Sequence, residues 1–153
     1  MKPFIGKAAL ITGAGGGIGR ALAGALAEGG ANLVLCGRNV ERLSESCEIA
    51  RAAGVEAIPF PGDLTGDGYP AACVKRATDR FGRLDILINN AGEVLAKPFE
   101  AIAPEEYDRV MAVNTRAPFL MCQAALPHLK AAQGAILNIG SVVSHKGYPM
   151  QSV

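Results

Sequence analysis

The sequence predicts an α/β fold built on a doubly wound parallel sheet, incomplete at about five strands. Short, almost entirely apolar runs alternate with segments of helical periodicity along the 153 residues. A glycine cluster separates the first apolar run from the first helix, and polar residues follow several later runs. No repeat, linker or low-complexity segment interrupts this order, so we expect a single domain over residues 1–153.

The expected strands are apolar over nearly their whole length, which is typical of strands buried on both faces of a parallel sheet. They cover residues 7–12, 32–36, 56–60, 85–89 and 135–139. Intervening helices imply right-handed crossovers. In such sheets ligands bind beyond the carboxyl ends of the strands, so candidate site residues are expected there.

The first expected helix covers residues 17–28 and ends at Gly29 and Gly30. The residues expected on its buried face are Ile18, Leu22 and Leu26. Asn39 is expected to cap a second helix that ends at Gly54, because its side chain can accept from a free N–H of the first turn. The apolar positions of that helix are Val40, Leu43, Cys47 and Ala50.

A third helix is expected over residues 69–81, and a long fourth helix begins near Pro104. Pro118 lies within the fourth pattern and has no N–H, so the carbonyl of Asn114 loses its helical donor. A carbonyl freed inside a protein needs another partner, and water is the expected one. The feature is either part of a proton relay or a simple kink.

Composition excludes several classes of partner. Fifteen basic and 14 acidic residues give a net charge of +1, which provides no electrostatic basis for binding nucleic acid or an anionic membrane. The apolar stretch 8–27 contains Arg20 and the glycine cluster, so it is not read as a membrane span. Four scattered cysteines and two histidines offer no metal constellation, and we expect buried, reduced thiols in a cytoplasmic protein.

The glycine cluster, TGAGGGIG at residues 12–19, stands between the first strand and the first helix. Small residues let the backbone approach a pyrophosphate, and the helix N-terminus offers free N–H groups and a positive dipole end. The pattern therefore predicts a dinucleotide-binding loop of the Rossmann type, although a turn that merely needs positive φ angles is the alternative. The expected cofactor contacts are Gly13, Gly16, Gly17, Ile18 and Gly19.

The end of the second strand bears on the choice of dinucleotide. NAD enzymes place an acid there for the ribose hydroxyls, whereas this chain has Gly37 followed by Arg38 and Asn39. A guanidinium pairs with the 2′-phosphate of NADP, which a carboxylate would repel. NADP is therefore favoured over NAD, with Arg38 and Asn39 as contacts; a solvent-facing arginine is the alternative.

Polar or small residues also follow the third and fourth strands. Asp63, followed by Leu64, is placed to accept from an adenine amino group, or to act as a turn residue. After the fourth strand, Asn90, Ala91 and Gly92 let backbone approach a ribose, unless they form an ordinary asparagine-rich turn.

Ser141 follows the fifth strand, where a hydroxyl would hydrogen-bond a substrate carbonyl oxygen as hydride arrives. Serine is common at strand ends, so this position alone is weak evidence. His145 is near in sequence, but no GxSxG elbow surrounds Ser141, and a nucleophilic serine is not expected.

Taken together and in order, these motifs resemble the short-chain dehydrogenase/reductase family over essentially the whole chain. The resemblance implies an NADP-dependent oxidoreductase that moves hydride between nicotinamide and a small carbonyl/alcohol substrate, with Asn114 and Ser141 matching two members of the active-site tetrad. It also implies a homo-oligomer for the intact protein. Substrate and reaction direction stay open.

The family's catalytic tyrosine, and the lysine one helical turn after it, have no match in this chain. By spacing the tyrosine would fall just beyond Val153; Tyr148 is too close to Ser141, and Ser152 stands where its lysine would be. We therefore expect a truncated chain that is inactive alone, with an uncovered fifth strand and poor stability. The alternatives are a non-catalytic dinucleotide-binding module and a non-functional fragment.

Overall fold

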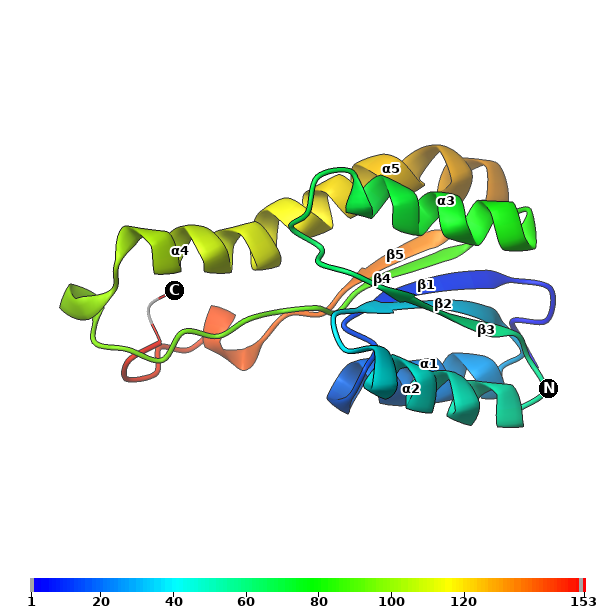
Figure 1. Ribbon diagram of the computed structural model, residues 1–153, viewed down its shortest axis with the longest axis horizontal. Helices are drawn as coiled ribbons and strands as arrows, with labels where there is room; N and C mark the ends of the chain where they lie inside the picture. Colours follow the sequence, from blue (N-terminus) through cyan, green and yellow to red (C-terminus); the bar gives the residue numbers. More distant parts are fainter. Residues whose placement is uncertain (1, 152) are drawn as a thin grey trace.

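The computed structural model describes residues 2–151 and 153, and its centre is one sheet of five parallel strands in the order β3-β2-β1-β4-β5 (Figure 1). The strands are β1 (Ala8–Thr12), β2 (Asn32–Gly37), β3 (Ala57–Pro61), β4 (Ile86–Asn89) and β5 (Ala135–Asn138). The expected doubly wound α/β fold is confirmed. Predicted strand ends were off by one residue, so that Lys7, Glu56, Asp85 and Ile139 flank the strands.

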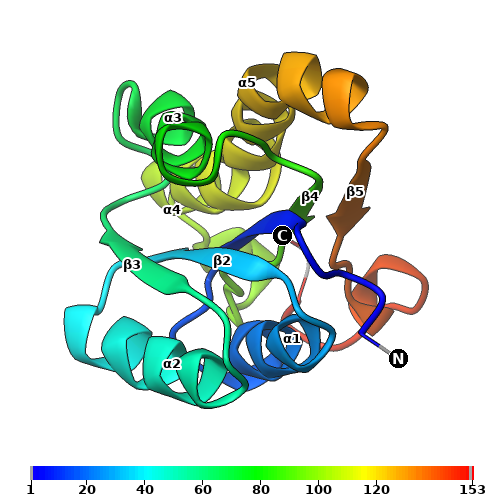
Figure 2. The same cartoon turned by 90° about the vertical axis from the view of Figure 1, so that its right-hand side faces the viewer.

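Helices cover both faces of the sheet (Figure 2). The helices α1 (Gly17–Glu28) and α2 (Val40–Ala52) lie on one face, and α3 (Tyr69–Phe81) and α5 (Ala117–Ala132) lie on the other. The side chain of Leu10 therefore packs in the α3/α5 layer and that of its neighbour Ile11 in the α1/α2 layer. This two-sided burial explains why the strands are apolar without alternation.

The predicted buried faces of α1 and α2 are confirmed in part, because Leu26, Leu43, Cys47 and Ala50 are buried and Leu22 packs against the core, whereas Ile18 and Val40 are exposed. Ile18 is 61% exposed and Val40 is 50% exposed. The residues buried on α1 are Gly19, Ala23, Leu26 and Ala27, and those on α2 are Leu43, Ser46, Cys47 and Ala50. On α1 small side chains occupy the contact stripe, and Ile18 lies off it because successive helical residues rotate by about 100°. The prediction is therefore wrong at Ile18 and Val40 alone.

The long fourth helix is two α-helices, α4 (Pro104–Met111) and α5, joined by a π-helical turn at Ala112–Arg116. In this turn the Ala117 N–H donates to the Ala112 carbonyl, five residues earlier. The turn contains Asn114 and ends two residues before Pro118, so the backbone is irregular near the position where the proline is expected to disturb it. The overhanging α4 extends beyond the carboxyl ends of the strands (Figure 1).

Strand β5 forms one edge of the sheet, and all four of its residues are exposed in this chain. The four thiols are free; Cys36, Cys47 and Cys73 are buried, whereas Cys122 is half-buried, contrary to the expectation for all four. Within the described residues no helix has the length and hydropathy needed to cross a bilayer.

Candidate dinucleotide site

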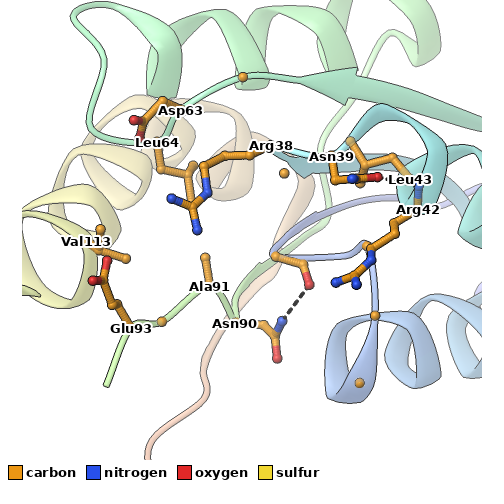
Figure 3. A pocket seen from close by; sticks show the side chains of 17 residues that line it. Arg38, Asn39, Arg42, Leu43, Asp63, Leu64, Asn90, Ala91, Glu93 and Val113 are labelled. Atoms are coloured by element: carbon orange, nitrogen blue, oxygen red, sulfur yellow. Dashed lines mark hydrogen bonds between the residues drawn. The ribbon is translucent and has the colours of Figure 1, made fainter. Parts of the chain in front are cut away.

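A hollow of about 490 Å³ opens beyond the carboxyl ends of β1 to β4 (Figure 3). Its walls come from four connections: the glycine loop after β1, the start of α2, the turn after β3 and the segment after β4. This is the edge at which parallel sheets bind ligands.

The glycine loop turns tightly against the end of β4. Gly13 has φ +65°, and a Cβ placed on it would lie 2.8 Å from the Cα of Ala91. A Cβ on Gly19 would lie 2.3 Å from the Gly13 carbonyl oxygen. By contrast, no atom lies within 4 Å of a Cβ placed on Gly16, which lines the hollow. Gly13 and Gly19 thus permit close backbone packing, and Gly16 keeps the opening clear.

Polar groups join the ends of β1 and β4 at the floor of the hollow. The Thr12 hydroxyl accepts from the N–H groups of Asn90 (3.0 Å) and Ala91 (3.1 Å). In return Asn90 Nδ2 donates to the carbonyl oxygens of Thr12 (3.0 Å) and Gly13 (3.2 Å), the latter beside the hollow in Figure 3. The Asn90 side chain therefore holds the start of the glycine loop in place.

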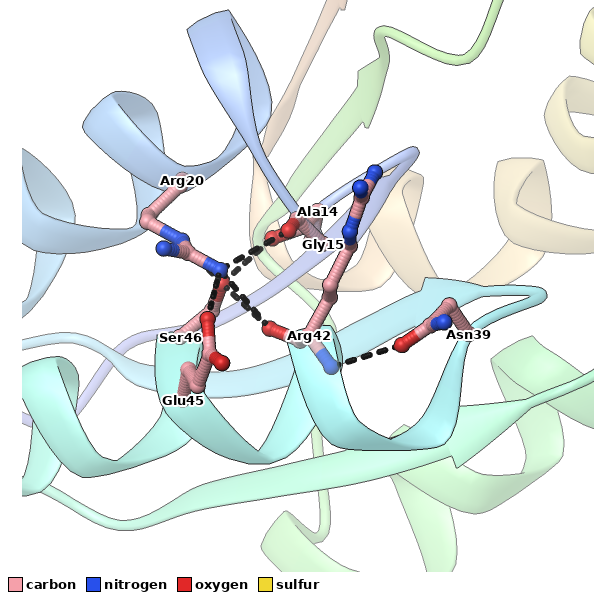
Figure 4. Close-up of polar contacts among 7 residues, drawn as sticks. All are labelled: Ala14, Gly15, Arg20, Asn39, Arg42, Glu45 and Ser46. Carbon is pink, nitrogen blue, oxygen red and sulfur yellow. Dashed lines mark hydrogen bonds and ion pairs between the residues drawn. The ribbon is translucent and has the colours of Figure 1, made fainter.

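The glycine loop is also fastened to α2 through Arg20 and Ser46 (Figure 4). Arg20 Nη2 donates to the Gly15 carbonyl at 2.9 Å, and the Ser46 hydroxyl donates to the Ala14 carbonyl at 2.8 Å. Arg20 also pairs with Glu45 (2.7 Å) and donates to Ser46 (3.0 Å). Two loop carbonyls are thus engaged by side chains, that of Gly15 by Arg20 of α1 and that of Ala14 by Ser46 of α2.

Two arginines line the hollow at the β2–α2 connection. In Figure 3 the guanidinium groups of Arg38 and Arg42 both turn toward its middle. Between them Asn39 caps α2, as predicted, by accepting from the Arg42 N–H at 2.8 Å. This end of the hollow is therefore positively charged.

Two carboxylates lie along other parts of the wall. Asp63 accepts from the Thr65 N–H (2.9 Å) and hydroxyl (2.8 Å), forming the turn after β3. These hydrogen bonds, with a smaller effect of the charge on Arg38, lower the pKa of Asp63. The turn role weighed for Asp63 is therefore present in the structure, beside its position on the wall.

The other carboxylate belongs to Glu93, whose backbone is held by Asn114. The Glu93 N–H donates to Asn114 Oδ1 and Asn114 Nδ2 donates to the Glu93 carbonyl, both at 2.8 Å. The Glu93 carboxylate accepts from Arg109 Nε at 2.6 Å. Through these contacts the π-helical turn and α4 hold the segment that follows β4.

Ser141 lies at the end of the segment after β5 and is exposed. Its hydroxyl accepts from the Val143 N–H at 3.4 Å, at the start of a short 3-10 turn (Val142–Ser144). In the part of the chain that the structure describes, no three His, Cys, Asp or Glu side chains gather as metal ligands.

A family model described as short chain dehydrogenase matches residues 7–153. The chain belongs to the short-chain dehydrogenase family. An uncharacterized oxidoreductase of Thermotoga maritima is 39% identical over 151 residues, which are 98% of this chain and 59% of the relative. The chain thus spans about three fifths of that relative's length.

Solved structures agree with this membership. A metagenomic short-chain oxidoreductase in complex with NADP has a TM-score of 0.92 and 36% identity, covering 98% of this chain and 69% of its own. An NAD+-bound xylitol dehydrogenase has a TM-score of 0.91 and 34% identity, covering 97% of this chain and 58% of its own.

Most residues predicted from the short-chain dehydrogenase motifs meet at the hollow. Those on its wall are Gly13, Gly16, Gly17, Arg38, Asn39, Asp63, Leu64, Asn90, Ala91 and Gly92. Ile18, Gly19, Asn114 and Ser141 are not on it, although Asn114 Oδ1 lies 3.6 Å from a Cβ placed on Gly92.

Sequence reasoning missed three side chains that shape the site: Arg20, Arg42 and Ser46. Arg42 lies one turn after Asn39, a spacing that places both on one side of a helix and was a usable signal. Ser46 is a buried polar residue on α2 whose hydroxyl donates to the Ala14 carbonyl in the glycine loop. No pattern in the sequence indicates this contact, because the two residues belong to different elements.

Proposed function

We propose that the intact protein is an NADP-dependent oxidoreductase that transfers hydride between nicotinamide and a carbonyl/alcohol substrate, and that this chain supplies its dinucleotide site. The observation that carries the proposal is Arg38, whose guanidinium faces the hollow at the end of β2. No acid occupies that strand end, where NAD enzymes hold the ribose hydroxyls.

The residues present fit a dinucleotide. The first turn of α1, after Gly16 and Gly17, offers N–H groups that no helical carbonyl accepts, which suits a pyrophosphate. The clear space at Gly16 leaves room for it. Asn90, Ala91 and Gly92 would lie along a ribose, and Asp63 and Leu64 would border the adenine end.

When bound, the cofactor supplies or accepts the hydride at its nicotinamide ring. In the intact protein the Ser141 hydroxyl would donate a hydrogen bond to the substrate oxygen. The Asn114 carbonyl, for which Pro118 has no N–H, would accept from a water in the proton path. The Asn114 side chain would meanwhile keep the backbone of Glu93 in place.

The relatives support the family chemistry but differ in cofactor, since one solved structure holds NADP and another NAD+. The preference is tested by calorimetric titration of the chain with NADPH and NADH. We expect NADPH to bind at least about tenfold more tightly, because charge-assisted hydrogen bonds to the extra phosphate add about 1.5–3 kcal/mol. Arg38→Ala should remove most of this advantage.

Arg76→Ala provides a matched control, because Arg76 is an exposed arginine on α3 that does not line the hollow. It should leave both affinities unchanged. Tighter binding of NADH than of NADPH by the unaltered chain would contradict the NADP assignment.

A non-catalytic dinucleotide-binding module is the second candidate, favoured by the position of Ser141 outside the wall of the hollow. NADPH consumption by the intact protein with a panel of ketones separates the two: turnover supports the catalytic function, and binding without turnover supports the module. We further propose a cytoplasmic location, supported by the free thiols, and a small-molecule rather than nucleic-acid partner; homo-oligomerisation of the intact protein stays a prediction.

A further inference from the structure

Arg42 has no assigned role in the proposed function, yet its side chain borders the same hollow as Arg38. We propose that Arg42 is a second cation for the 2′-phosphate of the cofactor and so a determinant of NADP specificity. This inference rests on the proposed function, and it adds a residue that the motifs do not mark.

The position of Arg42 is fixed by its backbone, independently of its guanidinium. Its N–H donates to Asn39 Oδ1 at 2.8 Å, and its carbonyl accepts from Arg20 Nη2 at 3.2 Å and lies 3.0 Å from the Ser46 hydroxyl. The contact with Arg20 links the first turn of α2 to the glycine loop, because Arg20 Nη2 also donates to the Gly15 carbonyl (Figure 4). The guanidinium therefore extends from an anchored base.

Arg42 lies at the adenosine end of the glycine loop. Its Cβ would be 3.2 Å from a Cβ placed on Gly15, two residues before α1 begins at Gly17. A pyrophosphate is bound at the N-terminus of α1, whereas the 2′-phosphate belongs at the end of β2, where Arg38 lies. Arg42 lies in the first turn of α2, four residues after Arg38, and both guanidinium groups turn toward the middle of the hollow (Figure 3).

The charges around the hollow also favour a phosphate beside Arg38 and Arg42. Its charged wall residues are Arg38, Arg42, Asp63 and Glu93. Glu93 is paired with Arg109, and Asp63 is engaged by Thr65. Across residues 2–151 and 153, neither Arg38 nor Arg42 forms an ion pair with a carboxylate, whereas Arg20 on the other side of the loop is paired with Glu45. Two neighbouring unpaired cations favour a dianionic phosphate.

The test is calorimetric titration of the full chain and its Arg42→Ala variant with NADPH and with NADH. Alanine keeps the Cβ against Gly15 and every backbone contact of Arg42, so only the guanidinium is lost. We expect NADPH affinity to fall about tenfold and NADH affinity to change less than twofold, since one charge-assisted hydrogen bond is removed. Arg42→Lys should restore part of the loss, and Arg76→Ala should change neither affinity.

Equal losses for both cofactors would overturn the inference and assign Arg42 to the pyrophosphate or to loop support. Unchanged affinities would overturn it as well. These outcomes differ from failure of the proposed function, in which the unaltered chain itself shows no preference for NADPH. As a second measurement, raising NaCl should reduce the NADPH advantage more in the unaltered chain than in Arg42→Ala, because salt screens exposed charges.

Discussion

The side-chain amide of Asn114 pairs in both directions with the backbone of Glu93, through two hydrogen bonds of 2.8 Å. One amide therefore satisfies both polar groups of a peptide segment that has no regular secondary structure. It connects the π-helical turn to the wall of the hollow.

Asn114→Ala removes both hydrogen bonds and should lower the free energy of unfolding by about 1–2 kcal/mol, at about 1 kcal/mol for each bond. Urea denaturation measures this loss. Gln123→Ala, an exposed amide on α5, should be neutral. An unchanged midpoint for Asn114→Ala would show that the paired amide contributes nothing to the fold.

Ser46→Ala should weaken both stability and NADPH binding. The hydroxyl is buried and lies 2.8 Å from the Ala14 carbonyl, so its loss leaves a buried acceptor unpaired, at a cost of about 1–3 kcal/mol. Ser44 is exposed on the same helix, and Ser44→Ala is the control. Denaturation and NADPH titration of both variants check the prediction; equal behaviour of the two would refute it.

Gly13→Ala and Gly24→Ala should have opposite effects on stability. At Gly13 the new Cβ meets Ala91 backbone at 2.8 Å in a left-handed conformation, and a loss of about 2 kcal/mol or more is expected. At Gly24, inside α1, a Cβ meets only Ile49 Cγ2 at 3.9 Å, so alanine should stabilise by about 0.5–1 kcal/mol. Thermal unfolding measures the change in melting temperature of each variant. A higher melting temperature for Gly13→Ala would contradict the close packing of Gly13 against Ala91.

The ionisation of Asp85 should make the free energy of unfolding depend on pH. Burial alone would raise the pKa of its carboxyl, but hydrogen bonds from Arg83, the Ala8 N–H and Lys7 outweigh this effect and lower it. A carboxyl whose pKa is lower in the folded chain stabilises the fold above its unfolded pKa of about 3.9, and this stability is lost as pH falls through and below that value.

Asp85→Asn should accordingly lower the free energy of unfolding by about 1–3 kcal/mol at neutral pH, because hydrogen bonds to a charge are weakened. Its stability should also fall less steeply from about pH 5 to pH 3, since the titrating group is gone. Urea unfolding across that range measures the slope. Asp79→Asn, which alters an exposed pair with Lys75, should change the free energy of unfolding at neutral pH by less than about 1 kcal/mol.

The β5 edge predicts self-association of the 153-residue chain. Ile136 and Leu137 are 38% and 46% exposed, and among the residues that the structure describes no strand pairs with the outer side of β5. Leu137→Lys places a charge on this edge and should reduce association, measured by sedimentation velocity over a range of concentrations. Gln123→Lys adds the same charge elsewhere as a control. A chain that is already monomeric at high concentration would contradict the prediction.

Much of the fold follows from local sequence. Buried parallel strands need apolar runs, and a positive φ at Gly82 ends α3 where the sequence predicts. Asn39 caps α2 because its side chain reaches a residue three positions later. Such features depend on neighbours in sequence, which is why periodicity and turn chemistry were sufficient.

The rest depends on contacts between distant segments. Arg20 is 25 residues from its partner Glu45, and Ser46 is 32 residues from Ala14. On its helix Ser46 resembles a solvent-facing residue until the glycine loop is placed over it. Ile18 is similar: it is exposed, whereas Gly19, Ala23 and Ala27 lie with Leu26 on the buried face of α1, which shows only when the helix is packed on the sheet.

The strand order has a consequence for synthesis on the ribosome. Strand β1 leaves the tunnel first but lies in the middle of the sheet, and one of its two neighbours, β4, begins at Ile86. The Thr12 hydroxyl can accept from the N–H groups of Asn90 and Ala91 only after these residues have been synthesised, so the ends of β1 and β4 are joined late. A nascent chain that holds the complete glycine loop but stops short of β4 therefore has no finished nucleotide pocket.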